Sequence, residues 1–230
     1  MDDSWQTAEV ELAESGISIM SGMLEAIGED YTSLETIAET GGVRPDDTWE
    51  KTRQNAEAVA QKAQSMNIEL VTFHAGFFPE ESCEERDKMM ERLRHILSYF
   101  DTCGVSMAFE TGQENAHNLI TVLKELNHPT LGVNFDPANM ILYGQGDPIE
   151  AVQLLTPWIR QVHIKDAKHP EVIGSWGTEV PSGMGDFCWK TFLSHIPEGI
   201  NLVIEREGGE QRVEDVKQAL NMLKELGECG

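Results

Sequence analysis

Short apolar runs alternate with amphipathic stretches along the chain. Runs rich in Ile, Leu, Val and Phe are typical of strands buried on both faces, whereas apolar residues that recur every three or four positions indicate helices. The predicted strands are residues 17–22, 69–74, 105–110, 131–136, 161–166 and 201–205. The predicted helices are residues 46–66, 81–102, 115–126, 148–158, 186–195 and 211–226, with the Asp46-Asp47 pair as an N-cap of the first. This alternation indicates a parallel α/β sheet, either an open doubly wound sheet or a closed barrel.

The residues that end the predicted strands favour the barrel. Five of the six runs finish in a side chain that can bind a metal ion or transfer a proton: His74, Glu110, Asp136, the group at 163–166, and Glu205. Asp136 is followed by Pro137, which has no N–H, so the strand must stop with its carboxylate at the carboxyl end. Any one of these residues could cap a helix or form a loop ion pair instead. Together they predict one site, because the strand ends of a parallel barrel meet at one face.

The stretches around these residues resemble a known family. They read VTFHAG, MAFETGQ, GVNFDPANM, QVHIKDA, GMGDFCW and LVIERE, between about residues 71 and 207. In this order they are similar to the xylose-isomerase-like (β/α)8 TIM barrels, a superfamily of sugar isomerases and epimerases that also includes apurinic-site endonucleases. The resemblance implies that Glu110, Asp136, His163 and Glu205 bind one divalent cation. It also implies that Glu110 and Glu205 serve as the acid-base pair.

The chemistry of these four side chains agrees with the resemblance. Three carboxylates and one imidazole form an oxygen-rich site that suits Mn²⁺, Mg²⁺ or Co²⁺ better than a structural zinc, with catalytic Zn²⁺ as an alternative. Such a cation would polarise a sugar carbonyl and stabilise an enediolate. Two carboxylates could then move a proton between faces of one carbon, as in an epimerase, or between neighbouring carbons, as in an isomerase.

Four further residues are predicted to contact the substrate. His74 faces the substrate or the metal, or else is a hydrogen-bonded histidine of the barrel core. Asn139 occupies a position where the trinuclear-zinc endonucleases of the superfamily carry a histidine, so we interpret it as a hydrogen-bonding residue. Lys165 and Arg206 lie next to the implied ligands and would bind a carboxylate or phosphate, unless they form surface ion pairs with Asp166 or Glu207. We expect the remaining histidines, at positions 95, 117, 128, 169 and 195, to lie on the surface.

Composition narrows the choice of partners. The 40 acidic and 17 basic residues give a net charge of −23, which opposes binding to nucleic acid or to an anionic membrane. The four cysteines are scattered, without a C-x-x-C pair, and no segment reaches the ~18 apolar residues of a membrane span. There is no G-x-G-x-x-G or G-x-x-x-x-G-K-[ST] motif. We therefore expect a cytoplasmic protein that acts on a small molecule, a sugar or keto-acid.

The amino-terminal part of the predicted barrel is short. Residues 4–15 have helical spacing, and they lead directly into residues 17–22, which resemble the third strand of the family. The 230 residues are accordingly expected to form a single domain, a barrel that lacks its first two strands. An open barrel exposes strand edges, so either the natural chain is longer or a neighbouring subunit of a homo-oligomer covers the gap.

Three functions remain open from the sequence. The first is a metal-dependent isomerase or epimerase of a sugar. The second is a dehydratase of an inosose or a dehydroshikimate, because an enediolate can also expel a β-hydroxyl group. The third is a sugar-binding protein without catalytic activity, which would keep the ligand residues but bind without turnover.

Overall fold

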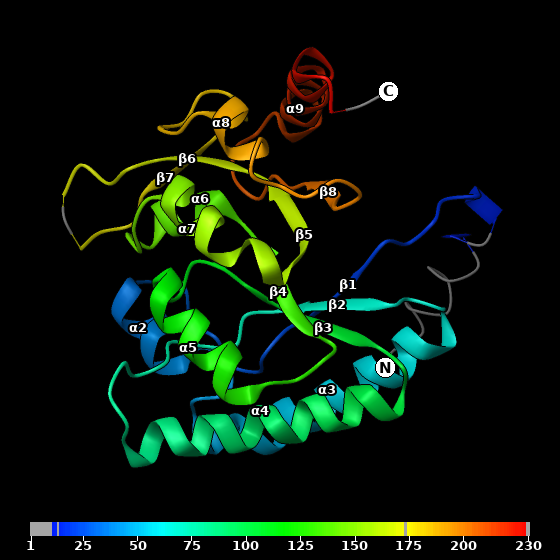
Figure 1. Cartoon of the computed structure of the whole chain (residues 1–230), viewed down its shortest axis with the longest axis vertical. Coiled ribbons are helices and arrows are strands. Elements are labelled where there is room, and N and C mark those ends of the chain that lie inside the picture. Colours follow the sequence, from blue (N-terminus) through cyan, green and yellow to red (C-terminus); the bar gives the residue numbers. More distant parts are fainter. Residues whose placement is uncertain (1–10, 13, 173, 229–230) are drawn as a thin grey trace.

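Parallel strands form one sheet, and most of the helices lie along its outer side (Figure 1). The computed structural model describes residues 11–12, 14–172 and 174–228. The strand order is β1-β2-β3-β4-β5-β8, and every neighbouring pair is parallel. The strands are β1 (Gly22–Leu24), β2 (Leu70–Phe73), β3 (Ser106–Glu110), β4 (Leu131–Phe135), β5 (Ile159–Ile164) and β8 (Asn201–Ile204). Within the described residues β1 and β8 are the two ends of the sheet, so the barrel is incomplete there.

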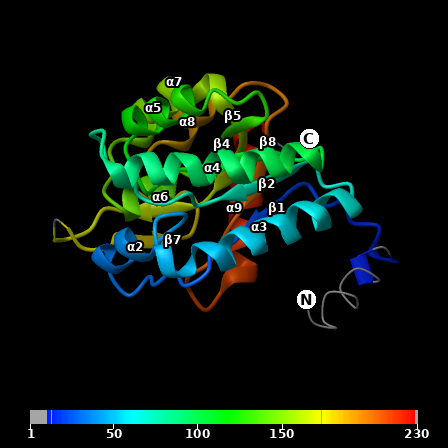
Figure 2. The ribbon, with the colours of Figure 1, turned by 90° about the horizontal axis from the view of Figure 1, so that it is seen from below.

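Helices connect consecutive strands, as the alternating pattern predicts. In the view from below, α3 and α4 lie side by side in front of β1 and β2 (Figure 2). The helices are α2 (Leu34–Thr40), α3 (Asp46–Ser65), α4 (Glu84–Thr102), α5 (Ala116–Leu126), α6 (Pro137–Leu142), α7 (Pro148–Leu155), the 3₁₀ helix η1 (Thr156–Trp158), α8 (Trp189–Leu193) and α9 (Arg212–Leu226). The structure thus confirms the predicted α/β class, a TIM-barrel-like fold.

The central strands are continuous apolar runs because both of their faces are covered. All residues of β2 and β4 are buried. Phe73, Phe109 and Phe135 are at most 1% exposed and belong to the hydrophobic core that the helices share. Helix α3 contributes Ala56, Ala60 and Ala63 to this core. These residues lie on the helix face that the three-to-four residue spacing predicts.

Several predicted features differ from the observed ones in position. The predicted strand 17–22 is wrong in position, because β1 pairs with β2 only from Gly22 onward, and Ile17 and Met20 are exposed. The N-cap of α3 is Pro45, and Asp46 lies in the first turn, where its carboxylate pairs with Lys88 and Arg92 of α4. The predicted helix at 4–15 falls largely outside the described residues.

The pattern analysis did not predict two short helices, α2 and α6, or a two-stranded hairpin. Helices α2 and α6 are only 7 and 6 residues long, too short to show a clear helical period. An antiparallel hairpin of β6 (Asp166–Lys168) and β7 (Thr178–Val180) follows β5 and covers one side of the strand ends. No helix in the described part of the chain is long and apolar enough to cross a membrane. Cys83, Cys103 and Cys188 are free thiols, and the fourth cysteine lies outside the described residues.

Candidate active site

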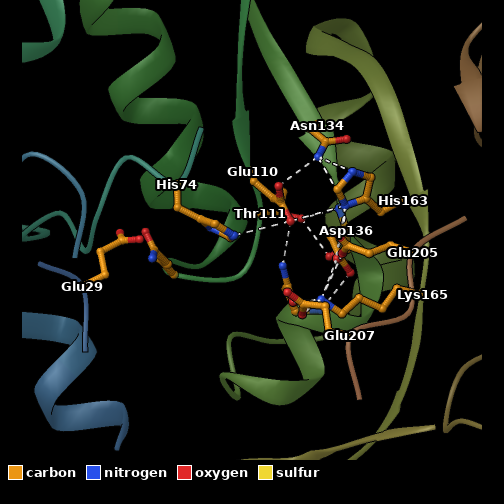
Figure 3. Close-up of polar contacts among 12 residues, drawn as sticks. Glu29, His74, Glu110, Thr111, Asn134, Asp136, His163, Lys165, Glu205 and Glu207 are labelled. Carbon is orange, nitrogen blue, oxygen red and sulfur yellow. Dashed lines mark hydrogen bonds and ion pairs between the residues drawn. The ribbon is translucent and has the colours of Figure 1, made fainter. Parts of the chain in front are cut away.

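The carboxyl ends of β3, β4, β5 and β8 bring four side chains together (Figure 3). Each side chain offers one ligand atom, and these four atoms all lie within 4.8 Å of one another. The residues are Glu110, Asp136, His163 and Glu205. The predicted convergence of these side chains is therefore observed, while their roles as ligands and catalysts stay predictions.

Glu110 is the last residue of β3, and its side chain is almost completely buried. Its Oε1 accepts a hydrogen bond from Nδ2 of Asn139 at 3.0 Å, and its Oε2 accepts one from Nδ2 of Asn134 at 3.1 Å. His74 Nε2 and His163 Nδ1 lie 3.5 and 3.4 Å from Oε1. Burial alone would raise the pKa of Glu110, but the electrostatic effect of the neighbouring His74 and His163 outweighs burial and lowers it. The carboxylate is thus ionised and fixed from two sides.

Asp136 is the acid that follows β4, and it has a structural role as well as a place in the site. It is the N-cap of α6, and its Oδ1 accepts a hydrogen bond from the Asn139 N–H at 3.0 Å, while Pro137 begins the helix. Its Oδ2 is buried without a hydrogen-bond partner. The Thr111 hydroxyl accepts from the Asp136 N–H and donates to the Asp136 carbonyl, both at 2.8 Å. The backbone is thereby clamped while one carboxylate oxygen stays available.

His163 turns one ring nitrogen toward the carboxylates. Its Nδ1 lies 3.2 Å from Glu205 Oε2 and 3.6 Å from Asp136 Oδ2. Burial opposes its protonation, but the close carboxylates of Asp136, Glu110 and Glu205 raise its pKa to about 12. Burial would raise the pKa of Glu205, but its contacts with His163 and Lys165 lower that pKa to about 2. Burial raises the pKa of Asp136 in spite of nearby Lys165.

Buried amides lie on the other side of the His163 ring. Nδ2 of Asn134 is 3.1 Å and Nε2 of Gln161 is 3.5 Å from His163 Nε2, and Gln161 Oε1 has no hydrogen-bond partner. These amides lie around Nε2, so Nδ1 is the ring nitrogen that faces the carboxylates.

This donor set fits a divalent cation. Three carboxylates in such close proximity repel one another, and here protonated His163 and Lys165 provide the compensating positive charge. The unpartnered Oδ2 of Asp136 and His163 Nδ1 both face the space between the carboxylates. Oxygen-rich sets of this kind suit Mg²⁺ and Mn²⁺.

Glu110 and Glu205 of this cluster line a cavity of about 790 Å³, a volume usual for small-molecule sites. His74, Asn139 and Lys165 line it, as the sequence predicts for substrate-contacting residues. Lys165 Nζ lies 3.0 Å from Glu205 Oε2 and 3.3 Å from Asn139 Oδ1. His74 is buried, and its Nδ1 has no hydrogen-bond partner.

Arg206 forms ion pairs with two acidic side chains. Its guanidinium pairs with Glu179 at 2.7 Å and with Asp215 at 2.8 Å, and it is not among the residues that line the cavity. Arg206 thus joins Glu179 of β7 to Asp215 of α9, and its contact with a substrate stays a prediction. The histidines expected on the surface differ in their exposure. Those at positions 95, 117 and 169 are exposed, whereas His128 and His195 are half-buried.

Sequence reasoning missed several residues of the site, namely Glu29, Thr111, Asn134, Tyr143, Gln161 and Glu207. The signal for two of them was strand alternation. Asn134 precedes Asp136 by two residues, and Gln161 precedes His163 by two, so both point to the face that carries the ligands. A polar residue that lies two positions before a strand-end site residue, in an otherwise apolar strand, therefore indicates the inner face of the barrel.

Comparison with known proteins agrees with this fold. A crystal structure of a xylose isomerase domain protein from Planctomyces limnophilus superposes with a TM-score of 0.89 at 33% identity, over 96% of this chain and 82% of that chain. A D-tagatose 3-epimerase-like protein shares the fold, with a TM-score of 0.74 at 17% identity, over 99% of this chain and 84% of that chain.

Curated relatives match over a shorter stretch. The 3-dehydroshikimate dehydratase of Bacillus anthracis is 27% identical over 51% of this chain and 44% of its own length. The uncharacterised protein YihM of Escherichia coli (strain K12) is 27% identical over 64% of this chain and 46% of its own length. The matched region thus spans less than half of either relative. The family model described as xylose isomerase-like TIM barrel matches residues 2–226, and the chain therefore belongs to that family.

Proposed function

We propose that this protein is a divalent-cation-dependent isomerase or epimerase of a sugar or sugar derivative. The observation that carries the proposal is the convergence of Glu110, Asp136, His163 and Glu205 within 4.8 Å at the wall of a cavity. A barrel of this fold from Mycobacterium smegmatis was solved in complex with magnesium, which supports a cation of that type. Bound here, the cation would polarise the carbonyl of the substrate and acidify the adjacent C–H group.

Glu110 and Glu205 are the proposed proton carriers. Glu110 ends β3 and Glu205 follows β8, so they approach the His163 strand from its two sides in the sheet order. The lowered pKa of each keeps both carboxylates ionised near neutral pH, ready to accept a proton from carbon. If one glutamate removes the proton and the other returns it to the opposite face, the carbon inverts. Return at the neighbouring carbon moves the carbonyl instead.

The surrounding residues hold these carboxylates in place. Asn139 and Asn134 each donate a hydrogen bond to Glu110, and Lys165 donates one to Glu205 at 3.0 Å. Because these partners are themselves buried, the orientation of the carboxylates is fixed before a substrate arrives.

A solvent-exchange experiment tests the proposal. A panel of ketoses, keto-acids and inososes is incubated with the protein and Mn²⁺ in D₂O, and the sugars are analysed by NMR. We expect deuterium at the inverted carbon or beside the carbonyl, because a carboxylate exchanges its proton with water between steps. Glu205→Gln should abolish both label and turnover but keep much of the cation affinity, whereas Glu210→Gln, an exposed change, should alter neither. Turnover without label would remove the glutamates from this role, and binding without turnover would favour a sugar-binding protein.

A dehydratase is the second candidate, and the relative from Bacillus anthracis favours it. The same proton removal, followed by loss of a β-hydroxyl group as water, would use the same side chains. Mass spectrometry of the products separates the two reactions, because a dehydratase product lacks one water and an isomerase product does not.

A further inference from the structure

The charge of the cavity wall outside the four-residue cluster bears on the class of substrate. We propose that the cavity binds an uncharged sugar or sugar derivative and disfavours phosphorylated and carboxylated ones. This inference rests on the proposed function, since it concerns the substrate of the same site.

Acidic side chains dominate the wall. Besides Glu110 and Glu205, the lining includes Glu25, Glu29, Glu179 and Glu207. Among the described residues that line the cavity, Lys165 is the only lysine or arginine. Binding of a phosphate or carboxylate normally relies on such a cation, often an arginine with two parallel N–H groups.

Lys165 is already committed to the protein. It donates hydrogen bonds to Glu205 and to Glu207 and is 2% exposed. Arg206, outside the wall, pairs with Glu179 and Asp215. An incoming anion would have to compete with carboxylates that each basic side chain already contacts.

The sum of charges remains negative when a cation is bound. A divalent cation and Lys165 together balance the three carboxylates of the cluster, and Arg206 balances Glu179. Glu25, Glu29 and Glu207 are left over. Burial raises the pKa of Glu29, yet even with a neutral Glu29 the wall has two more carboxylates than positive charges to balance them. A phosphate dianion is therefore repelled, whereas a neutral hydroxyl group is not.

The other lining residues suit a neutral polyhydroxylated molecule. Tyr31, Tyr143 and Trp176 line the same cavity, and the rings of Tyr143 and Trp176 pack edge to face with centroids 4.8 Å apart. Aromatic rings pack against the C–H faces of sugars, while carboxylates accept hydrogen bonds from hydroxyl groups. The aromatic side chains can thus contact the C–H faces of a sugar, and the acidic side chains can bind its hydroxyl groups. The charge also disfavours a dehydroshikimate, which carries a carboxylate.

Matched ligands test the inference without requiring turnover. Calorimetry with the Mn²⁺-loaded protein compares D-fructose, D-tagatose and D-psicose with the 6-phosphates of D-fructose and D-tagatose. We expect at least one neutral ketose to bind, and its phosphate to bind at least about tenfold more weakly. Raising the salt concentration should narrow the ratio, because the repulsion is screened.

Variants identify the origin of the discrimination. Glu25→Gln combined with Glu207→Gln should narrow the neutral-to-phosphate ratio. The matched double change Glu198→Gln with Glu214→Gln, at exposed acids outside the cavity, should leave it unchanged. Equal or tighter binding of the phosphates overturns the inference, and so does failure of every neutral ketose to bind.

The outcomes separate this inference from the proposed function. A neutral sugar that binds but takes up no deuterium leaves the inference standing and contradicts the isomerase. A sugar phosphate that is turned over with solvent label supports the isomerase and overturns the inference.

Discussion

Nζ of Lys165 lies 3.0 Å from Oε2 of Glu205, and this ion pair joins the ends of two neighbouring strands, β5 and β8. The lysine is buried, whereas the side chain of Glu205 is 25% exposed on the cavity side. The pair therefore holds a carboxylate that is proposed to bind a cation and to carry a proton. Lys165→Met should remove this contact and leave the Glu205 carboxylate less fixed in its orientation.

Asp136→Asn is expected to weaken Mn²⁺ binding by at least about tenfold, the lower end of what even supporting residues of a metal site contribute. Asparagine still caps α6, so the free energy of unfolding of the metal-free protein should stay nearly unchanged. Calorimetric titration and urea unfolding measure the two effects. Asp147→Asn at the exposed N-cap of α7 is the matched control and should change neither. Unchanged Mn²⁺ affinity in Asp136→Asn would contradict the site.

Thr111→Val is expected to destabilise the protein by about 1–3 kcal/mol, because it leaves the buried N–H and carbonyl of Asp136 without their partner. Mn²⁺ affinity should fall as well, since the clamp positions the Asp136 side chain. Urea unfolding and calorimetry report both changes. In Thr121→Val, the lost hydroxyl is exposed on α5, and the change should stay within about 0.5 kcal/mol.

Gln161→Leu is expected to lower cation affinity by about 10- to 100-fold, because the ring of His163 loses a buried amide that lies 3.5 Å from its Nε2 and helps to orient it. The matched control is Gln153→Leu, which removes a similar amide contact to His195 near the surface. Calorimetry with Mn²⁺ compares the two variants with the unmodified protein. Equal affinities would show that Gln161 has no part in orienting His163.

The stability of the metal-free protein should depend on pH through His163. Its pKa in the folded protein is about 12, above the value of about 6.5 for an unfolded chain. A raised pKa contributes stability that is complete below about pH 6.5 and is lost as the pH rises toward 12. Urea unfolding in EDTA should therefore give a lower free energy at pH 9 than at pH 6.

The same measurement at low pH examines Glu205. Its pKa of about 2 lies below that of an unfolded glutamate, so its contribution is present above about pH 4.5 and is lost as the pH falls toward 2. His163→Gln should remove the decline between pH 6 and pH 9, and it should also weaken the acid limb, because His163 is the main contact that lowers the pKa of Glu205. A decline that persists in His163→Gln would assign it to other groups.

Much of the fold could be predicted because a parallel sheet covered on both faces has an unambiguous sequence pattern. The runs that became β2 and β4 are wholly buried, and their predicted limits differ from the observed ones by at most one residue. Strand β1 was misplaced because its limits depend on where it pairs with β2, and this pairing begins only at Gly22. The apolar run at 17–22 does not determine those limits. Pairing partners are distant in the sequence, so local composition does not identify them.

For the site, the sequence by itself determined that polar side chains end successive parallel strands, and the direction of the strands brings such ends to one edge. Alternation along each strand also placed Lys165 on the same face as His163, and Arg206 on the opposite face from Glu205. Only the tertiary structure decided which groups meet there. Lys165 is buried against Glu205, whereas Arg206 turns to Glu179 and Asp215. Side-chain direction follows from local backbone geometry, but ion-pair partners, burial and pKa depend on segments that approach only when the chain folds.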